Sequence, residues 1–357
     1  MTAVFAIPGD KDRRTGGFIY EARVLDELNA LGCTTTHMVL PDSFPVPTNA
    51  DMQTTLEMLR AVDPRQVIIL DGLVFGALDP AGLATVQAPV IAMLHHPLGL
   101  ETGIDPALAS HLLRNEAACL HHAAHIVVPS PHTAKILIDD FGADQTKISV
   151  ALPGFDRPIR HPKPNDPPLI VSIGLLTKRK GHDVLLNALA MIQDIPWQAE
   201  IIGKRHDETI ADALIAQNKA LCLSDRVTFT GEMNTETMQG RLNAASIFAL
   251  ATRYEGYGMV LSEAMLFGLP IVSCITGAVP DTVGDAGILV PVDDASGIAG
   301  ALRHLLTNEP ARIAFADAAH ARSKSLPNWS DTAQVMKGAI QRQRVTQVHP
   351  YSGQNNQ

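Results

Sequence analysis

The sequence holds two glutamates, Glu255 and Glu263, with seven residues between them, and two glycines, Gly256 and Gly258, in that interval. Ionised carboxylates accept hydrogen bonds from sugar hydroxyls, and the N–H groups in the first turn of a helix bind phosphate. Glycines beside such a turn let a ligand approach the backbone closely. Glutamates are usually solvated surface charges, but this setting favours an anionic ligand that is rich in hydroxyl groups.

The flanking residues predict the strand-to-helix turn that this chemistry requires. Residues 246–250 are a short apolar run with a β-branched residue and an aromatic one, which indicates a buried strand. Apolar pairs recur at helical spacing over residues 260–265, and Gly268 followed by Pro270 ends the helix. We therefore expect the two glycines to lie where a buried strand passes into a helix.

Two other stretches follow expected strands and suit contact with a ligand. The charged loop 9–17 ends in Gly16 and Gly17 before a helix, which suits either an ordinary turn or backbone N–H groups that approach phosphate. The pair His95 and His96 stands at the end of an apolar run. A single histidine is commonly a buried structural residue, whereas a pair at the carboxyl end of a strand is better placed for ligand contact.

Three consecutive cations, Lys178, Arg179 and Lys180, stand between an expected strand and an expected helix. Such runs often form a solvated loop. At the start of a helix, however, positive side chains and backbone N–H groups together bind a diphosphate. The run therefore predicts a phosphate site.

Strand-like and helix-like segments alternate along the chain. This alternation indicates parallel strands with crossover helices in a doubly wound sheet, where ligands bind beyond the carboxyl ends of the strands. The expected strands are 4–7, 36–40, 66–70, 90–94, 126–128, 148–150, 169–174, 199–202, 226–229, 246–250 and 271–273. The clearest helices are 18–31, 108–124, 133–141, 184–192, 208–221 and 235–244.

Length and composition describe a globular protein with room for two domains: 357 residues, 46% hydrophobic and 18% charged. The net charge of −9 and the 4% of aromatic residues argue against a nucleic-acid-binding protein, which usually needs a concentrated basic face. Four scattered cysteines, no signal-peptide pattern and no apolar run of ~20 residues predict a reduced, cytoplasmic chain.

Prolines between residues 153 and 168 predict a connector between the domains.

The segment from Glu255 through Glu263 to Pro270 resembles the E-x7-E signature of retaining glycosyltransferases of the GT-B fold, family 4. The resemblance spans essentially the whole chain and is densest from residue 174 to residue 290. It implies an α/β protein of two Rossmann-like, doubly wound domains that face each other across a cleft. An acceptor-side domain would comprise residues 1–160, to which a helix at about 328–345 returns. A nucleotide-sugar domain would comprise residues 161–327, and residues 347–357 would be a disordered tail.

The resemblance implies roles for the residues described above. Glu263 would hold the ribose hydroxyls of a nucleotide sugar, Glu255 the transferred sugar, and Lys180 the phosphates. The other donor-binding residues that it implies are Gly16, Gly17, Arg179, Gly203, Lys204, Glu232, Gly256, Tyr257, Gly258, Met259 and Val260.

The family carries a catalytic histidine near the transferred sugar and the acceptor. This histidine corresponds best to His95, with His96 as the alternative. The family also often carries an arginine directly after the glycine that ends the strand, where this chain has Leu175. The missing charge would then come from Lys178, Arg179 or Lys204.

The implied reaction is the transfer of a hexosyl group from a UDP- or GDP-sugar to a hydroxyl of a small molecule or glycan, with retention of configuration. We expect no cofactor and no metal. The only Asp-x-Asp, Asp10 to Asp12, has cations beside it that would repel a metal ion. His121 and His125 form an i,i+4 pair with His122 between them, but a third ligand is not evident, so solvated or capping histidines are the simpler interpretation.

Other functions stay open on the same evidence. A sugar phosphorylase or a nucleotide-sugar epimerase could use the same two domains, and a non-catalytic protein could bind a sugar nucleotide without turnover. Analysis of the products separates these possibilities. Membrane association is not favoured, because no strongly basic amphipathic helix is evident, but it is not excluded.

Overall fold

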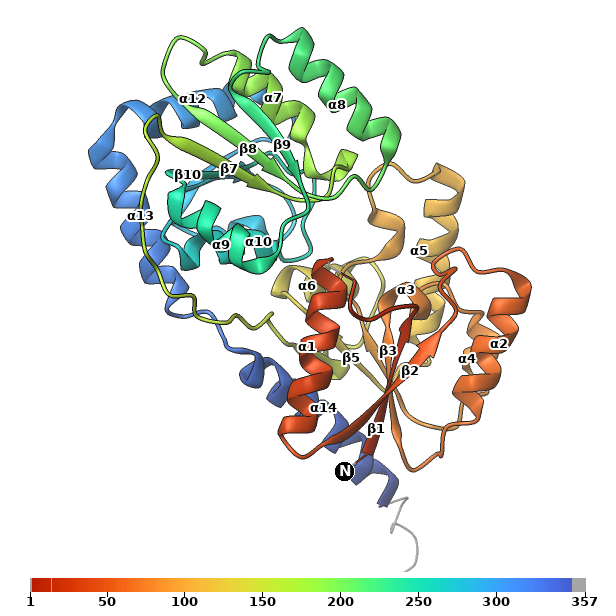
Figure 1. Cartoon of the computed structure of the whole chain (residues 1–357). Coiled ribbons are helices and arrows are strands. Elements are labelled where there is room, and N and C mark those ends of the chain that lie inside the picture. Colours follow the sequence, from red (N-terminus) through yellow and green to blue (C-terminus); the bar gives the residue numbers. More distant parts are fainter. Residues whose placement is uncertain (1, 14, 349–357) are drawn as a thin grey trace, which may run out of the picture. The chain divides into compact units, whose positions relative to one another are not determined.

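The chain divides into two compact units (Figure 1). The structure is a computed structural model that describes residues 2–13 and 15–348. Unit 1 comprises Met1–Phe155 and Pro327–Gln357, and unit 2 comprises Asp156–Leu326. The first crossing lies a few residues before the expected boundary at residue 160, and the chain returns to unit 1 close to the expected residue 328.

Unit 1 contains a six-stranded sheet in the order β2-β1-β3-β4-β5-β6, and every pairing is parallel. The chain passes from β1 to the edge strand β2 and then restarts at β3 on the other side of β1. A topological switch point, where ligands bind in doubly wound sheets, therefore lies between β1 and β3. The strands are β1 (Thr2–Pro8), β2 (Thr34–Leu40), β3 (Val67–Asp71), β4 (Val90–Met93), β5 (His125–Val128) and β6 (Ile148–Val150).

Helices cover both faces of this sheet, with α1 and α14 on one face and α2 to α5 on the other (Figure 1). The last helix, α14, returns after unit 2 and buries Trp329, Ala333, Met336, Ala339 and Ile340 in unit 1. The helices are α1 (Gly16–Ala30), α2 (Asn49–Arg60), α3 (Gly72–Phe75), α4 (Pro80–Leu83), α5 (Pro106–Leu120), α6 (Pro131–Asp139) and α14 (Trp329–Val348), with 3-10 turns η1 (Leu98–Leu100) and η2 (Gln145–Lys147).

Unit 2 contains a second six-stranded parallel sheet, in the order β12-β11-β10-β7-β8-β9. Read from β9, this is the 3-2-1-4-5-6 order of the Rossmann fold, and its switch point lies between β7 and β10. The strands are β7 (Leu169–Ile173), β8 (Gln198–Ile202), β9 (Val227–Gly231), β10 (Ile247–Leu250), β11 (Ile271–Cys274) and β12 (Gly287–Val290).

The helices of unit 2 also lie on both faces, so its central strands are buried on both sides. All residues of β7, β10 and β11 are buried, as expected for continuous apolar runs in a covered parallel sheet. The helices are α7 (His182–Ala190), α8 (Glu208–Ala220), α9 (Thr235–Ala244), α10 (Met259–Leu266), α11 (Val279–Val283), α12 (Ala295–Thr307) and α13 (Glu309–Ser323), with the 3-10 turn η3 (Lys178–Lys180).

The structure confirms the α/β doubly wound fold and each strand expected from the sequence. The helix expected to reach residue 124 ends earlier, because α5 stops at Leu120. The sequence patterns did not predict α2, α12 and α13. Of the tail 347–357, the first two residues end α14 and the rest lie outside the described residues.

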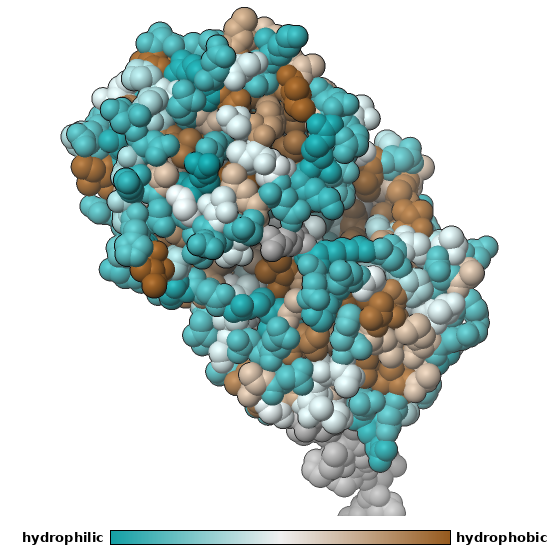
Figure 2. Space-filling view, in the orientation of Figure 1, coloured by the Kyte–Doolittle hydropathy of each residue, from teal (hydrophilic) through white to brown (hydrophobic). Residues whose placement is uncertain are grey.

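The outer surface is mostly hydrophilic, as expected when the apolar residues are buried between the sheets and their helices. The face shown in Figure 2 is mostly hydrophilic, with apolar residues scattered between charged ones. Among the described residues, no helix is both long enough and apolar enough to cross a membrane.

Candidate active site

The predicted phosphate-binding and carboxylate residues of unit 2 meet at its switch point. Lys180 and Glu255 lie in the loops that follow the neighbouring strands β7 and β10. Gly203, just after β8, lies against the first of these loops. A Cβ atom built on Gly203 would be 1.9 Å from the carbonyl oxygen of Gly174, so only glycine fits there. The strand order thus gathers residues that are far apart in the sequence.

Lys180 and Glu255 form a buried ion pair. Lys180 Nζ donates to Glu255 Oε1 at 2.7 Å, and Thr252 Oγ1 donates to the same oxygen at 3.0 Å. Arg179 Nη1 lies 3.4 Å from Glu255 Oε2. Burial acts to raise the pKa of Glu255, but the two cations and the hydrogen bonds outweigh it and hold this pKa below its usual value. Glu255 is therefore ionised at neutral pH, and a lysine and an arginine share its charge.

A close backbone contact fixes the position of Lys180. Gly181 directly follows η3 and has a φ of +65°, a conformation that favours glycine. A Cβ atom on Gly181 would lie 1.8 Å from the carbonyl oxygen of Ala251, the residue directly after β10. Arg253 strengthens this junction, since it donates to both carboxylate oxygens of Asp183 in the first turn of α7. The three-cation segment is thus an ordered turn between β7 and α7, and it packs against the loop that follows β10.

The two glycines of the E-x7-E segment stand where β10 passes into α10, as predicted. Gly258 has a φ of +87° and precedes Met259 and Val260, the first residues of the helix. The first turn of α10 has no acidic residue and no side-chain cap, so the positive end of the helix dipole is not neutralised by the helix's own first turn or its cap residue. The Tyr257 backbone is held by Thr282 Oγ1, which donates to its carbonyl oxygen at 2.7 Å.

The turn after β11 supports the Glu255 backbone from the other side. Ala278 N donates to the Glu255 carbonyl oxygen at 2.9 Å. Gly277 has a φ of +52°, and a Cβ atom there would lie 2.2 Å from that same oxygen. Gly277 and Ala278 therefore lie against the backbone of Glu255.

Glu263 lies inside α10 and is partly buried. Burial raises its pKa to about 6, and the positive charge of Lys180 acts in the opposite direction. Lys180 thus acts electrostatically on both glutamates of the segment, and Glu263 titrates closer to neutrality than an ordinary glutamate.

The other predicted donor-binding residues lie at the ends of β8 and β9. Lys204 follows β8 and Glu232 follows β9, and both side chains are exposed. Lys178 is exposed as well. Of the three cations considered as replacements for an arginine at Leu175, Arg179 is the one whose described contacts include Glu255.

In unit 1 the structure brings the glycine loop and the histidine pair together. α1 begins at Gly16, and a Cβ atom on Gly17 would lie 3.2 Å from His95 Cδ2. The His95 ring meets the edge of the Tyr20 ring at a centroid distance of 5.3 Å and an interplanar angle of 84°. Thr133 Oγ1 donates to the His95 carbonyl oxygen at 3.4 Å. His95 is therefore held in a defined position beside the start of α1.

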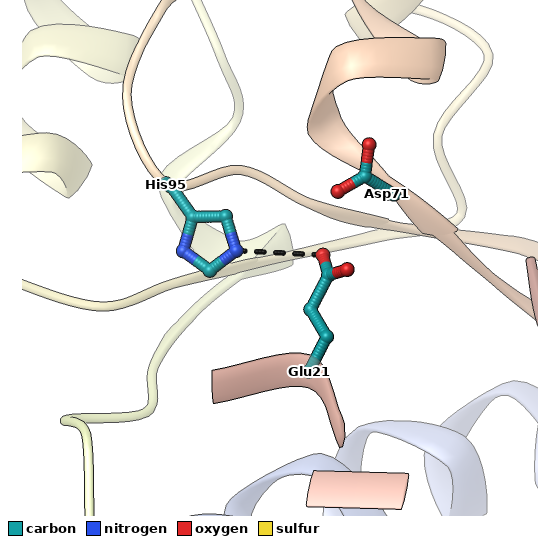
Figure 3. Close-up of side chains that lie close together, drawn as sticks. All are labelled: Glu21, Asp71 and His95. Atoms are coloured by element: carbon teal, nitrogen blue, oxygen red, sulfur yellow. Dashed lines mark hydrogen bonds and ion pairs between the residues drawn. The ribbon is translucent and has the colours of Figure 1, made fainter. Parts of the chain in front are cut away.

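Two carboxyl groups that the sequence analysis did not identify lie next to His95 (Figure 3). Glu21 Oε1 is 3.4 Å from His95 Nε2, and Asp71, the last residue of β3, lies within the same group. Burial raises the pKa of Glu21 to about 7 and raises that of Asp71 well above its usual value. Burial also lowers the pKa of His95, so this imidazole is neutral at pH 7.

His96 makes a different contact from His95. Its Nε2 lies 3.2 Å from Glu101 Oε2, and both side chains are partly exposed. The two histidines of the pair thus lie in separate surroundings, with His95 beside the two buried carboxyl groups and His96 beside Glu101.

His121 and His125 do not lie on one helix, so the alternative of two metal ligands on one helix face is wrong, and His121 and His122 are solvated as expected. α5 ends at Leu120, His121 and His122 are exposed in the turn that follows, and His125 begins β5. His125 Nε2 hydrogen-bonds with Ser149 Oγ at 2.9 Å. Within residues 2–13 and 15–348, the one group of side chains close enough to share a metal ion is Glu21, Asp71 and His95.

The sequence of unit 2 matches a known protein family. Residues 156–322 match the family described as "Glycosyl transferases group 1". This match covers nearly all of unit 2 and includes Lys180, Glu255 and Glu263.

Curated relatives extend the likeness into unit 1. The chain is 28% identical over 242 residues to "D-inositol 3-phosphate glycosyltransferase" from Mycolicibacterium smegmatis, covering 64% of this chain and 55% of the relative. It is 29% identical over 171 residues to "Mannosylfructose-phosphate synthase" from Agrobacterium fabrum, covering 43% and 38% of the two chains. The chain thus spans about half the length, or less, of these relatives.

Solved structures share the fold over nearly the whole chain. "Sucrose-phosphate synthase" from Thermosynechococcus elongatus superposes with a TM-score of 0.81 at 19% identity, covering 97% of this chain and all of the other. Anabaena Alr3699/HepE "in complex with UDP and glucose" superposes with a TM-score of 0.75 at 17% identity, covering 95% and 99%. Unit 2 therefore belongs to the glycosyl transferases group 1 family, and the chain has the GT-B fold of the glycosyltransferases that it resembles.

Proposed function

We propose that the chain is a retaining glycosyltransferase that moves a hexosyl group from a nucleotide-diphosphate sugar to a hydroxyl acceptor without a metal ion. The observation that carries this proposal is the buried contact between Lys180 and Glu255 at the switch point of a group 1 domain. A nucleoside diphosphate leaves with concentrated negative charge. Lys180, Arg179 and the N-terminus of α10 would stabilise that charge in the transition state.

The proposed donor is a UDP-sugar. Anabaena Alr3699/HepE, which shares the fold, has been solved in complex with UDP and with UDP-glucose. Glu263 would accept hydrogen bonds from the ribose hydroxyls, because it lies on α10 behind the glycines that let the nucleotide approach. Glu255 would contact the transferred sugar, and the loops after β8 and β9 would complete the part of the donor site that unit 2 provides. Donor binding by Gly16 and Gly17 of unit 1 stays a prediction.

The proposed acceptor is a small hydroxylated molecule or a glycan. The names of the curated relatives include inositol phosphate and a sugar phosphate, which fits an acceptor of this size. His95 would orient a hydroxyl of the transferred sugar and stabilise positive charge at the anomeric carbon. The donor's own phosphate would take the proton of the acceptor, so the reaction needs no protein base. The cytoplasmic location stays a prediction.

Isothermal titration tests this proposal. Purified protein is titrated with UDP, GDP, ADP and their common sugar conjugates, with and without EDTA. We expect micromolar binding of one nucleotide series and no effect of EDTA. No binding at millimolar concentration would contradict the donor site, and binding that EDTA abolishes would contradict metal independence.

Substitutions at Glu263 and His95 should separate donor binding from transfer. Glu263→Ala should mainly weaken nucleotide binding, because it removes the carboxylate that holds the ribose. His95→Ala should leave nucleotide affinity unchanged and lower the rate of transfer. Titration calorimetry and a product assay measure the two effects. A His95→Ala variant that transfers sugar at the normal rate would show that its proposed role is wrong.

Donor binding should weaken in acid through Glu263. Its pKa of about 6 means that Glu263 is mostly ionised at pH 7.5 and mostly protonated at pH 5. A protonated carboxyl is a poorer acceptor for ribose hydroxyls, so affinity should fall about tenfold over this interval. UDP-glucose is the suitable ligand, because its diphosphate is a diester and does not titrate near pH 6.

The matched control for this pH dependence is Glu263→Gln. It should bind UDP-glucose more weakly than the wild type at pH 7.5 and show a flat profile down to pH 5. A wild-type affinity for UDP-glucose that stays constant from pH 7.5 to pH 5 would contradict this prediction. If Glu263→Gln loses affinity in acid as the wild type does, a group other than Glu263 causes the pH dependence.

A further inference from the structure

Three titratable side chains from separate segments of unit 1 converge beside the start of α1. Glu21 comes from α1, Asp71 from the end of β3, and His95 from the loop after β4 (Figure 3). Their ligand-type atoms all lie within 4.8 Å of one another. Glu21 and Asp71 are 0% and 3% exposed, so water does not screen their charges.

The two carboxyl groups cannot both be ionised in this arrangement at reasonable cost. Among the described residues, no lysine or arginine forms a salt bridge with either of them. Glu21 Oε2 is buried, and no N–H or O–H group among those residues donates to it. An oxygen of Glu21 and an oxygen of Asp71 instead lie within 4.8 Å of each other. A proton held between the two carboxyl groups would remove the repulsion between like charges at this distance.

The surroundings favour one proton on the pair rather than two. Asp71 Oδ1 accepts from Leu73 N at 2.8 Å at the start of α3, a bond that favours a negative charge on Asp71. Two carboxylates that share a site commonly retain a single proton between them, because like charges at this distance repel strongly. The pair then has one negative charge and faces His95, the other titratable group that acts on it.

The pair determines the state of the His95 ring. Glu21 Oε1 lies 3.4 Å from His95 Nε2. With the shared proton directed toward Asp71, Oε1 is left as an acceptor, and this favours the His95 tautomer that carries its proton on Nε2. Nδ1 is then the unprotonated nitrogen, and Figure 3 shows it on the side of the ring that is turned away from Glu21. The edge contact with Tyr20 and the close approach of Gly17 hold the ring in this orientation.

We propose that Glu21 and Asp71 are positioning residues that share one proton and hold His95 as the neutral tautomer protonated on Nε2, with Nδ1 presented as an acceptor to a hydroxyl of the bound sugar. This proposal rests on the proposed function, because it gives His95 the hydroxyl of a sugar substrate as its ligand. The state of the ring can nevertheless be measured without any substrate.

A divalent cation is the competing explanation for the same three groups. Binding of a metal ion would require an unprotonated His95 Nε2 and would displace the shared proton from the carboxyl pair. It would also compete with the bond from Leu73 N for Asp71. In the proton-sharing arrangement His95 Nε2 keeps its proton, the carboxyl pair keeps the shared proton, and Asp71 keeps its hydrogen bond from Leu73 N.

The test is nuclear magnetic resonance of the full-length chain labelled with 15N-histidine. His95→Gln assigns the signals of His95. We expect a downfield Nε2–H resonance that is protected from exchange at pH 7, because a buried carboxyl oxygen accepts this hydrogen. We also expect a His95 protonation midpoint below its ordinary value of about 6.5.

Three substitutions distinguish positioning from a merely structural role. Glu21→Met removes the acceptor and should abolish the protected resonance. Glu21→Gln should retain it, because the amide oxygen still accepts from Nε2 and the amide N–H replaces the shared proton toward Asp71. Asp71→Asn removes the like charge beside Glu21, so Glu21 itself should be ionised. The negative charge then lies on the group that contacts His95, and the protonation midpoint of His95 should rise by on the order of one pH unit. Glu27→Met, on the same helix, is the matched control and should leave both signals unchanged.

Several outcomes would overturn the proposal. They are an unprotected Nε2–H in the wild type, an unchanged resonance in Glu21→Met, or an unchanged midpoint in Asp71→Asn. Stoichiometric binding of added Zn²⁺ or Mn²⁺ with loss of the resonance would establish the metal site instead.

If a transfer assay is in hand, Glu21→Met should lower kcat and leave nucleotide affinity intact. A chain that binds no nucleotide but shows the expected resonances would contradict the proposed function and leave the positioning of His95 standing.

Discussion

Replacing Lys180 with methionine is expected to lower the rate of sugar transfer by about two to three orders of magnitude, the usual cost of removing one group that stabilises developing negative charge. Methionine retains the length of the side chain, so the change removes mainly the ammonium group. Initial rates with a UDP-sugar measure the effect, and Lys219→Met, an exposed position on α8, is the control. A rate within about threefold of the wild type would show that Lys180 does not act on the leaving group.

The same substitution should leave a buried carboxylate without its closest cation. The ion pair holds the pKa of Glu255 below the value of an unfolded chain, so ionised Glu255 contributes stability above about pH 4.3, and this contribution is lost as pH falls through the folded-state pKa. Lys180→Met should therefore be less stable than the wild type at pH 7, and the difference should shrink toward pH 4. The double variant Lys180→Met/Glu255→Gln should regain stability without regaining transfer, because it removes the uncompensated charge.

Gly181→Ala should destabilise unit 2 by at least about 3 kcal/mol. The positive φ costs a non-glycine residue about 1 to 2 kcal/mol, and the added methyl group would lie 1.8 Å from the Ala251 carbonyl oxygen, so the backbone of η3 or of the β10 loop must move. Calorimetry should show the melting of unit 2 lowered by roughly 6 to 12 °C. Because Lys180 directly precedes this glycine, nucleotide affinity should fall as well.

Gly231→Ala is the matched control for this prediction. Gly231 lies in the same unit and has a φ of +73°, but no atom lies within 4 Å of the position that a Cβ would occupy. It therefore isolates the cost of the backbone conformation. Equal losses of stability in the two variants would show that the contact with Ala251 is not what fixes this segment.

The sequence predicted the strands of unit 2 and the strand-to-helix turn at Gly256 and Gly258, because the relevant signals are local. Glu255, the glycines and Glu263 lie in one short segment, and Lys180 directly precedes a helix. The apolar runs of a parallel sheet also stand out, since strands covered on both faces are continuously hydrophobic. The helix α12 was missed although Ile298, Leu302 and Leu305 recur at helical spacing, whereas α13 buries only Ala319 and Ser323 and has a weak apolar period.

The surroundings of His95 could be predicted only in part. The position of His95 at the end of β4 follows from the alternation of strands and helices. Its partners Glu21 and Asp71 come from distant segments, and their contact depends on the strand order β1-β3-β4, which periodicity does not determine. One signal was available: Glu21 lies four residues after Gly17, and such a spacing puts both on one face of α1.

Unit 2 is inserted into unit 1, and this has a consequence for the growing chain on the ribosome. Residues 156–326 are contiguous and can fold once they have emerged, whereas unit 1 lacks α14 until all of unit 2 has been made. At 5 to 20 residues per second, making unit 2 takes roughly 10 to 30 s. Throughout that time the face of the first sheet that carries α1 lacks the apolar side chains of α14, among them Trp329, Met336 and Ile340. Unit 1 therefore begins synthesis first but completes its core last, and its nascent form exposes apolar surface that chaperones recognise.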